Sequence, residues 1–460
     1  MPYDRQQGGK SGHIDLVKNP DVDAFLKNCK YMREPSDEEG KSIAMSYLDV
    51  PSIGCLPEKI IASDASTYSK AISDRFPSTQ VGYVKVSLVL VDLKEFNSLT
   101  EPGSRYVDPF KVAKMHRNAN SIAFTLPGSN IRFKDEKTVK DGFRRAIFEQ
   151  FSSDQTNLTK NGQYSLTDTL LAIHEGSVEI KKCPSCGLKW NHDLIFNKDY
   201  LIQECEHCRT NIYITDDLRI HEQVTDYGDC GAAITRFMNV VEHLLVAGVV
   251  RMLADDNPRA LSNMGFVLDG PLAIFGQPAD IHKRLMSMYH SVSEKLLSLN
   301  LQPPLVLGLQ KDGQVMEHAR SLVPFFDEFC RTGGIKKSFY RAVDDCYRGK
   351  YISEVSSANF GHETYYGQDF IYRTDSGRIF VVGIPYPFKD KSNITDFAIK
   401  KADPQNFGGL LARAFDLIRY FELDLYSNAI VPVALAHRHA SISLVPGGKV
   451  LDIMTRAGLS

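Results

Sequence analysis

Apolar and polar positions divide the chain into a polar beginning and a longer body of strand and helix patterns. Residues 1–45 are polar and rich in Gly, Lys and Asp, with a weak helical pattern near 20–33. We expect a peripheral arm there. The first apolar strand covers Ile60 to Ala62, and we expect it to end at Asp64.

Further along the chain, segments with the two-residue hydrophobic period of strands alternate with segments with the 3.6-residue period of helices. Runs with a strand pattern lie at 81–93, 121–127, 264–272, 303–313 and 378–387. Apolar residues at helical spacing predict helices at 135–151, 165–175, 230–253, 280–298 and 407–425, with a helical or mixed segment at 432–443. Strands come first and are then interleaved with helices, which predicts a mixed α/β sheet with helices on its faces.

The pattern is interrupted at 178–215, where two CxxC pairs occur as CPSC and CEHC. This spacing lets four thiolates close a tetrahedron around zinc. Four sulfur ligands leave no open position, so the predicted site is structural. His207 lies inside the second pair and is a rival ligand that CxxC geometry disfavours. The predicted zinc ligands are Cys183, Cys186, Cys205 and Cys208.

The role of this zinc ribbon is open at the level of sequence. Trp190 and the lysines at 181, 182 and 189 are compatible with contact to a nucleic acid. Binding a partner or capping a surface are the alternatives.

Composition narrows the class of protein. The chain has 460 residues, 43% hydrophobic and 24% charged, which is ordinary for a globular protein of two or three domains. We find no apolar run of transmembrane length and no secretory signal, so we expect a cytoplasmic protein without a membrane segment. The net charge of −2 argues against a surface coated with positive charge. Binding to DNA would then depend on a local basic surface, or would be shared with a partner.

Three carboxylates stand where a hydrolytic site would need them. Asp64 and Asp269 each follow an apolar strand, and Glu242 lies at the border of the apolar stripe of the long helix. Hydrolysis of a phosphodiester needs an activated water and a stabilised leaving group, and metal ions clamped by carboxylates supply both. Hard oxygen ligands suit Mg²⁺ or Mn²⁺. Taken singly, each residue also fits a turn, a cap or a solvated face.

Five segments of the chain match one known family, and they are IIASDAS, the helix with Val241 and Glu242, FVLDGPLAIFG, VLGLQKDG and PVALAHRHASIS. Together they resemble the NurA nucleases, a family with a ribonuclease H/Piwi-like fold. The resemblance covers about residues 55–175 and 216–460. The chain departs from the family at Asp-Ala-Ser, where Asp-Gly-Ser is common, and in the inserted ribbon.

The resemblance implies roles for individual residues. Asp64, Glu242 and Asp269 would bind Mn²⁺ or Mg²⁺, and His437 would be a fourth ligand or a proton donor to the leaving group. Lys311 would hold the scissile phosphate. Rivals are Glu222 for Glu242 and His439 for His437, and Tyr68 is a weaker candidate for a DNA contact.

The resemblance also implies a homodimer that works on DNA with a hexameric HerA-type ATPase, in end processing or antiviral defence. The chain has no Walker GxxxxGK[ST] signature, so ATP use would belong to the partner. We expect an arm at 1–50, a nuclease domain at 51–177 and 216–460, and the ribbon at 178–215. Two alternatives remain open, a non-catalytic zinc-ribbon adaptor and an inactive scaffold subunit.

Overall fold

The computed structural model describes residues 18–29, 33–51, 54–99, 108–332, 338–353, 361–392, 394–422, 429–442, 451 and 454–455. In these residues a nine-stranded sheet has the order β1-β11-β12-β13-β10-β9-β2-β3-β4. Its strands are β1 (Leu48–Asp49), β2 (Lys59–Ser73), β3 (Phe76–Asp92), β4 (Ala119–Pro127), β9 (Met264–Asp269), β10 (Leu305–Gln310), β11 (Phe339–Ala342), β12 (Gly367–Arg373) and β13 (Ile379–Pro385).

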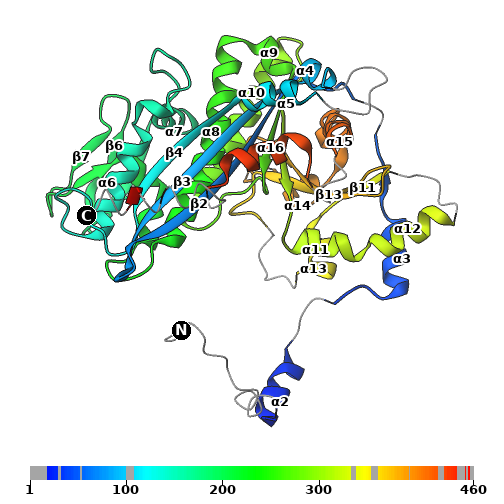
Figure 1. Cartoon of the computed structure of the whole chain (residues 1–460), viewed down its shortest axis with the longest axis horizontal. Coiled ribbons are helices and arrows are strands. Elements are labelled where there is room, and N and C mark those ends of the chain that lie inside the picture. The colour runs from blue at the N-terminus through cyan, green and yellow to red at the C-terminus, as the bar shows by residue number, and fades with distance from the viewer. Residues whose placement is uncertain are drawn as a thin grey trace.

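Helices cover both faces of this sheet (Figure 1). They are α2 (Pro20–Asn28), α3 (Asp37–Met45), α4 (Leu93–Asn97), α5 (Pro109–His116), α6 (Val139–Phe151), α7 (Leu166–Ile173), α8 (Gly231–Asp256), α9 (Pro258–Ser262), α10 (Ile281–Ser298), α11 (Gln314–Ser321), α12 (Val323–Arg331), α13 (Asp345–Tyr351), α14 (Phe397–Lys400), α15 (Leu410–Phe421) and α16 (Val431–Ala440). The predicted mixed α/β architecture is therefore confirmed.

The central strands form the predicted ribonuclease H-like core. β2, β3 and β4 are an antiparallel meander, and β9 and β10 run parallel to β2. The long helix α8 lies between β4 and β9 in the chain, so a crossover connects the meander to the parallel strands. The predicted helices at 135–151, 165–175, 230–253, 280–298 and 407–425 correspond to α6, α7, α8, α10 and α15.

The expected end of the first strand at Asp64 is wrong. β2 continues to Ser73, because β3 pairs with it along nearly its whole length. Its other neighbour, β9, pairs with it only as far as Ser63 and Leu268. Asp64 therefore lies inside a strand, at the point where the second neighbour stops.

Side-chain alternation divides the sheet into two faces with different helices. Ile60 and Ala62 pack in one buried cluster with α15 and α16. Val84 and Val86 pack in another with α6, α7, α8 and α10. We call these the α16 face and the α8 face. By length and composition α8 could cross a membrane, but 72% of its most apolar window is buried inside the protein, as in a core helix.

The polar beginning of the chain has two parts. α2 buries none of its residues, as expected of an arm (Figure 1). α3, in contrast, buries Ile43 and Ala44 in a third cluster with α11, α12 and β13, on the α8 side of the sheet. β1 then pairs with β11 at the sheet edge. The region 314–373, for which we predicted no element, supplies β11, β12 and three helices.

The ribbon consists of two short hairpins, β5 (Val178–Lys182) with β6 (Lys189–Phe196) and β7 (Ile202–Glu204) with β8 (Asn211–Tyr213). Its apolar side chains, among them Phe196 and Ile212, belong to the same buried cluster as α6 and α8. The strands of the ribbon are thus not part of the main sheet, but the apolar side chains of the ribbon share the buried core under that sheet.

Candidate active site and metal centre

Asp64 and Asp269 lie side by side at the carboxyl end of β9, where the parallel pairing of β9 with β2 ends, although β2 itself continues to Ser73. Ser63 is opposite Leu268 in the β2–β9 pairing, so Asp64 and Asp269 occupy the next positions on adjacent strands. Both point to the α16 face, because side chains alternate and Ala62 and Val267 pack there. Ligand sites of α/β sheets usually lie at this edge.

A helix from the end of the chain adds His437 to this pair. Val433 and Ala436 of α16 are buried against the sheet, and this packing turns His437 toward Asp64. His437 Nδ1 lies 2.7 Å from Asp64 Oδ2. Asp64, Asp269 and His437 offer ligand atoms that all lie within 4.8 Å of one another. Two carboxylates and an imidazole at this spacing suit a divalent cation such as Mn²⁺ or Mg²⁺.

Lys311 completes the described surroundings of Asp269. It follows β10, and its Nζ lies 2.5 Å from Asp269 Oδ2. The pKa of Asp269 is raised to about 6, because burial and the charge of Asp64 raise it by more than the neighbouring Lys311 lowers it. Asp269 therefore holds a proton more readily than an exposed aspartate, and a cation would have to compete with that proton.

Glu242 lies on the other face of the sheet. It is buried on α8, and the hydroxyl of Ser63 donates to its Oε1 at 2.9 Å. Burial and the nearby charge of Asp64 raise the pKa of Glu242 to about 8. Its carboxylate is outside the cluster formed by Asp64, Asp269 and His437. Of the four predicted catalytic-metal ligands, the structure brings together these three.

The rival residues are not brought into the cluster either. Glu222 is exposed and pairs with Arg219 at 2.8 Å. His439 is half-buried on α16 and, like Glu222, is not part of the cluster at Asp64.

The departure from Asp-Gly-Ser has a simple structural explanation. Ala65 is an ordinary residue of β2, paired with Val86, and is not among the described residues with positive φ. Its N–H donates to Asp64 Oδ1 at 2.8 Å, which orients the carboxylate. No backbone conformation reserved for glycine is needed at this position.

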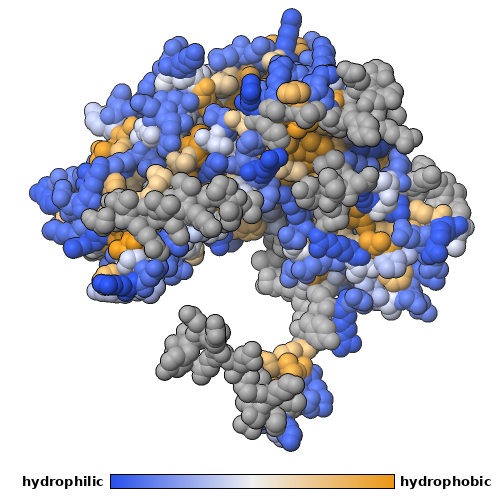
Figure 2. Space-filling model, viewed as in Figure 1, coloured by the Kyte–Doolittle hydropathy of each residue, from blue (hydrophilic) through white to orange (hydrophobic). Residues whose placement is uncertain are grey.

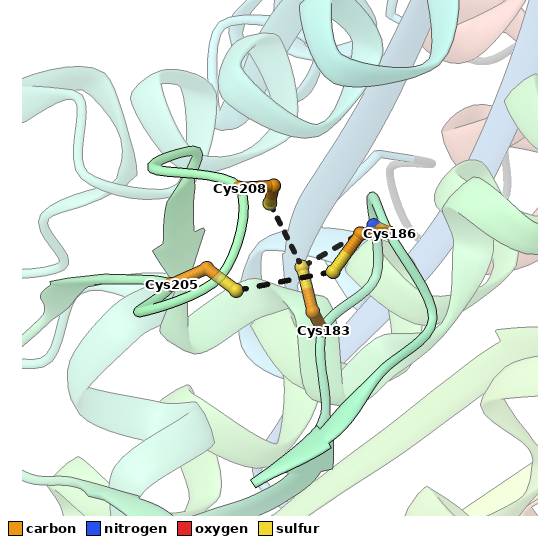
Figure 3. Close-up of side chains that lie close together, drawn as sticks. All are labelled: Cys183, Cys186, Cys205 and Cys208. Atoms are coloured by element: carbon orange, nitrogen blue, oxygen red, sulfur yellow. Dashed lines mark hydrogen bonds between the residues drawn. The ribbon is translucent and has the colours of Figure 1, made fainter.

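The four predicted cysteines converge from two matching turns (Figure 3). Gly187 N–H donates to Cys183 O and Arg209 N–H donates to Cys205 O, both at positive φ in corresponding positions. The sulfur atoms lie 3.6 Å apart for Cys183 and Cys208 and 3.9 Å apart for Cys186 and Cys205.

These separations fit one tetrahedral ion. Four sulfurs at the usual zinc–sulfur distance lie about 3.8 Å apart. The ligand atoms of all four cysteines lie within 4.8 Å of one another, and His207 is not part of the group. Among the described residues, the predicted four-cysteine site is therefore present as a geometry suited to a metal.

A buried ion-pair network fixes the ribbon to α6. Arg144 is 1% exposed and binds Asp216 through two nitrogens at 2.8 and 2.6 Å, and Asp141 at 2.8 Å. It also donates to the Asn211 carbonyl of β8 at 2.7 Å. Trp190 is buried in the shared core, so its ring packs against protein and is not exposed for contact with a nucleic acid. The lysines at 181, 182 and 189 are exposed.

Ser63 is the residue at this site that sequence reasoning missed. It lies between two predicted site residues, donating to Glu242 while its neighbour Asp64 faces the opposite side. The only sequence signal was its place beside Asp64 in a strand, where alternation reverses direction at each residue.

Comparison with known proteins returns structural matches only. No protein-family model and no curated protein matches the chain. The chain is similar in structure to the NurA nuclease from Sulfolobus solfataricus, at 9% identity and a TM-score of 0.32, covering 96% of this chain and 94% of that one. It is also similar to a second NurA structure, at 11% identity and a TM-score of 0.28, covering 98% of each chain. Similarity this low supports no conclusion about activity, which must come from the residues of the site.

Proposed function

We propose that this chain is a divalent-metal-dependent nuclease that hydrolyses phosphodiester bonds in DNA. The observation that carries the proposal is the cluster of Asp64, Asp269 and His437 where the parallel pairing of β2 with β9 ends, with ligand atoms within 4.8 Å of one another. A site of hard oxygen ligands beside a lysine suits a cation that binds phosphate.

When bound, Mn²⁺ or Mg²⁺ would lower the pKa of a water molecule and stabilise charge on the scissile phosphate. Asp64 and Asp269 would hold the cation between adjacent strands. Lys311, which pairs with Asp269 at 2.5 Å, would exchange that partner for a phosphate oxygen of the substrate. The lysine would thereby position the phosphate as a point charge.

His437 has two roles open to it in this proposal. Its Nδ1 lies 2.7 Å from Asp64, and its side chain is 59% exposed. Oriented by Asp64 in this way, it would present Nε2 to the substrate and donate a proton to the leaving alkoxide. Alternatively, it would ligate the cation directly, as the predicted fourth ligand, because its ring offers a ligand atom within 4.8 Å of those of Asp64 and Asp269.

Glu242 as a metal ligand remains a prediction. Its buried carboxylate would have to leave Ser63 and reach the sheet edge, giving up a hydrogen bond of 2.9 Å. In the described arrangement Glu242 can instead hold Ser63, the residue next to Asp64, in position by accepting its hydrogen bond on the α8 face.

The ribbon would hold Zn²⁺ in a structural role, because four thiolates leave no coordination position for water or substrate. From the resemblance we also carry forward a homodimer, a HerA-type hexameric ATPase as partner and a cytoplasmic location. A role in DNA repair and one in antiviral defence stay equally open.

The proposal is tested by incubating the full chain with labelled single-stranded DNA, duplex DNA and RNA, with Mn²⁺, Mg²⁺ or EDTA. We expect cleavage of DNA with a divalent cation and none in EDTA. Asp269→Asn should abolish cleavage, whereas Asp280→Asn, which neutralises an exposed aspartate paired with Lys283, should not change it.

Cleavage that survives both EDTA and Asp269→Asn would overturn the proposal. Absence of cleavage by the chain alone, with cleavage restored by a HerA-type ATPase, would show that the partner is required. Absence under both conditions would favour the scaffold or adaptor reading.

A further inference from the structure

The segment that follows Asp269 passes from one face of the sheet to the other. Asp269 points to the α16 face, whereas Leu272 belongs to the buried cluster under α8. The change of face occurs at Gly270, whose φ of 131° lies in a region that glycine adopts readily and other residues rarely. We call residues 270–273 the crossing segment, and it joins Asp269 directly to the core on the opposite face.

Three glycines on neighbouring strands lie against the crossing segment. Gly308 of β10 is directly opposite Gly383 of β13, and Gly367 of β12 is a diagonal neighbour of Gly383. The first two are on the α8 face, because the residues next to them, Leu309 and Val382, pack with α15 and α16 on the other face. We call Gly308, Gly383 and Gly367 the glycine row.

Each glycine of the row leaves space that a side chain would fill. A Cβ atom at position 308 would lie 2.6 Å from the carbonyl oxygen of Gly270, and one at position 367 would lie 2.8 Å from Leu272 Cδ1. At position 383 the nearest atom would be Leu272 Cγ, at 3.3 Å. Non-bonded carbon atoms pack best at about 3.5–4.0 Å, so the first two positions admit no side chain without movement. The crossing segment can therefore lie close to the backbone of the sheet because these positions are glycine.

Backbone hydrogen bonds fix the crossing segment at both ends. At its start, Gly270 N–H donates to the carbonyl of Leu309 at 2.9 Å. Near its end, the carbonyl of Leu272 accepts from Tyr366 N–H, also at 2.9 Å. Asp269 directly precedes the first of these bonds. A displacement of the crossing segment therefore reaches Asp269 through a single peptide unit.

The crossing segment is also confined by packing in the interior. Leu272 and Ala273 are 0% exposed. The view in Figure 2 shows hydrophilic residues over most of the described surface, with hydrophobic residues in separate small patches, whereas these two apolar side chains pack in the cluster under α8. Protein interiors are close-packed, so the segment cannot move away from the glycine row without disturbing its neighbours.

The distances indicate how strongly the glycine row can act on Asp269. With a Cβ atom at position 308, the carbonyl oxygen of Gly270 would have to move by about 0.7 Å to reach an ordinary carbon–oxygen separation of about 3.3 Å. Functional side chains must be held within about 0.5 Å of their working geometry. The required movement exceeds that tolerance, and it arises one residue from a member of the cluster with Asp64 and His437.

We propose that the glycine row positions Asp269, so that Gly308 is a positioning residue of the metal centre although it faces the opposite side of the sheet. The inference rests on the proposed nuclease function for the role of Asp269. The contact between the glycine row and the crossing segment can be measured without metal or substrate.

The first test compares Mn²⁺ binding by Gly308→Ala, Gly383→Ala and Gly409→Ala in the full chain, by isothermal titration without DNA. Gly409→Ala is the matched control, since a Cβ atom there would meet nothing within 4 Å and its φ is −71°. We expect Gly308→Ala to weaken binding about 10- to 100-fold. Gly383→Ala should weaken it less than about fivefold, because its contact is closer to an ordinary separation. Gly409→Ala should leave it unchanged.

Two further readouts separate positioning from a general loss of stability. At saturating Mn²⁺, Gly308→Ala should lower kcat for DNA cleavage about 10- to 100-fold and leave KM for DNA nearly unchanged, because Asp269 holds the cation and not the DNA. In metal-free buffer, amide hydrogen exchange should become faster in peptides that span 268–274. Peptides from the two cysteine turns should exchange as in the parent chain.

A compensating change keeps the inference testable if Gly308→Ala does not fold. Leu272→Ala removes the Cγ atom that a Cβ atom at position 383 would meet. Gly383→Ala should therefore cost less Mn²⁺ affinity in the Leu272→Ala background than in the parent chain, as expected for residues in contact. An equal cost in both backgrounds would overturn the role of this contact.

Parent-like Mn²⁺ affinity and exchange in a folded Gly308→Ala chain would overturn the inference. An equal loss in Gly308→Ala and Gly409→Ala would overturn it too, because the effect would not depend on the crossing segment. A parent chain that neither binds Mn²⁺ nor cleaves DNA would contradict the proposed nuclease function. In that case faster exchange at 268–274, confined to Gly308→Ala, would still support the positioning of Asp269 by the glycine row.

Discussion

The two candidate metal sites of this protein are built in opposite ways. The cysteine site is local, with all ligands between residues 183 and 208 on two nearly equivalent turns. The acidic cluster joins residues from three distant parts of the chain, and Asp64 and His437 are separated by 373 positions. The first would surround an ion with four thiolates, whereas the second includes His437, whose side chain is 59% exposed.

This difference separates stability from chemistry. A site of four thiolates has no open position and can only stabilise structure, so its loss should lower the free energy of unfolding. A site of carboxylates with an exposed imidazole can admit substrate, so its loss should lower the rate of cleavage.

The largest effect is expected from the cysteine site. Cys205→Ser removes one buried thiolate, and we expect loss of the bound zinc and a fall of several kcal/mol in the free energy of unfolding, since structural zinc contributes about 10–16 kcal/mol to small zinc domains. Zinc content by mass spectrometry and thermal unfolding measure this. Cys346→Ser, which changes an exposed cysteine, is the control. A full zinc complement in Cys205→Ser would contradict the assignment.

Asp64→Asn should act on turnover alone. We expect the rate of DNA cleavage to fall about 10³-fold, which corresponds to about 4 kcal/mol of transition-state stabilisation. Zinc content should stay at one ion per chain. Simultaneous loss of zinc and activity would show that the two sites are coupled and would break the comparison.

The buried Glu242 should make stability depend on pH. Its folded pKa of about 8 is above the ordinary value of 4.5, so the protonated form is favoured in the folded state. Its contribution is complete below pH 4.5 and is lost as pH rises through 8, a change of about 3–5 kcal/mol.

We therefore expect the unfolding free energy, measured without added divalent cation, to fall between about pH 5 and pH 8. In Glu242→Gln this decline should be largely absent, because the amide cannot ionise. An equally steep decline in Glu242→Gln would mean that other groups cause it.

The two roles of His437 differ in what they do to metal affinity. His437→Gln should lower cleavage about 10- to 100-fold through loss of the proton donor, while leaving the affinity for Mn²⁺ unchanged. His439→Gln, on the same helix, is the matched control. A parallel loss of Mn²⁺ affinity would instead make His437 a ligand.

The smallest effect is expected from the ion pair at Asp269. Lys311→Met removes the cation that opposes the upward shift of the Asp269 pKa, which is about 6 in the parent chain. The pH at which Mn²⁺ binding is half complete should therefore rise by about one unit. Isothermal titration at several pH values would show this shift, and an unchanged midpoint would exclude the contact as a determinant of metal binding.

The same contrast explains how far the sequence could be read. The four cysteines were predictable because the ligands and the turns that place them lie together in the chain. The positions of Asp64 and Asp269 at one sheet edge also followed from the strand pattern. The length of β2 did not, because its residues beyond Asp64 are held by pairing with β3 and by contact with α16.

The face of the sheet on which Glu242 lies could not be predicted from the sequence either. The helical pattern placed it at the border of the apolar stripe, but not on one side of a sheet. Only the packing of α8 against Ser63 shows that Glu242 approaches β2 from the α8 face, whereas Asp269 points to the α16 face. The burial of Trp190 was not predictable for the same reason, since packing of the ribbon against α6 is a tertiary property.

The adjacency of Ser63 and Asp64 restricts how this protein can change over evolutionary time. One of these neighbours contacts α8 and the other contacts α16. Insertion or deletion of a single residue between the start of β2 and Asp64 would exchange their directions, leaving a hydroxyl at the sheet edge and a carboxylate in the core. The short turn at 197–201, between β6 and β7, faces no such limit, so we expect related chains to vary in length there and to keep a constant spacing before Asp64.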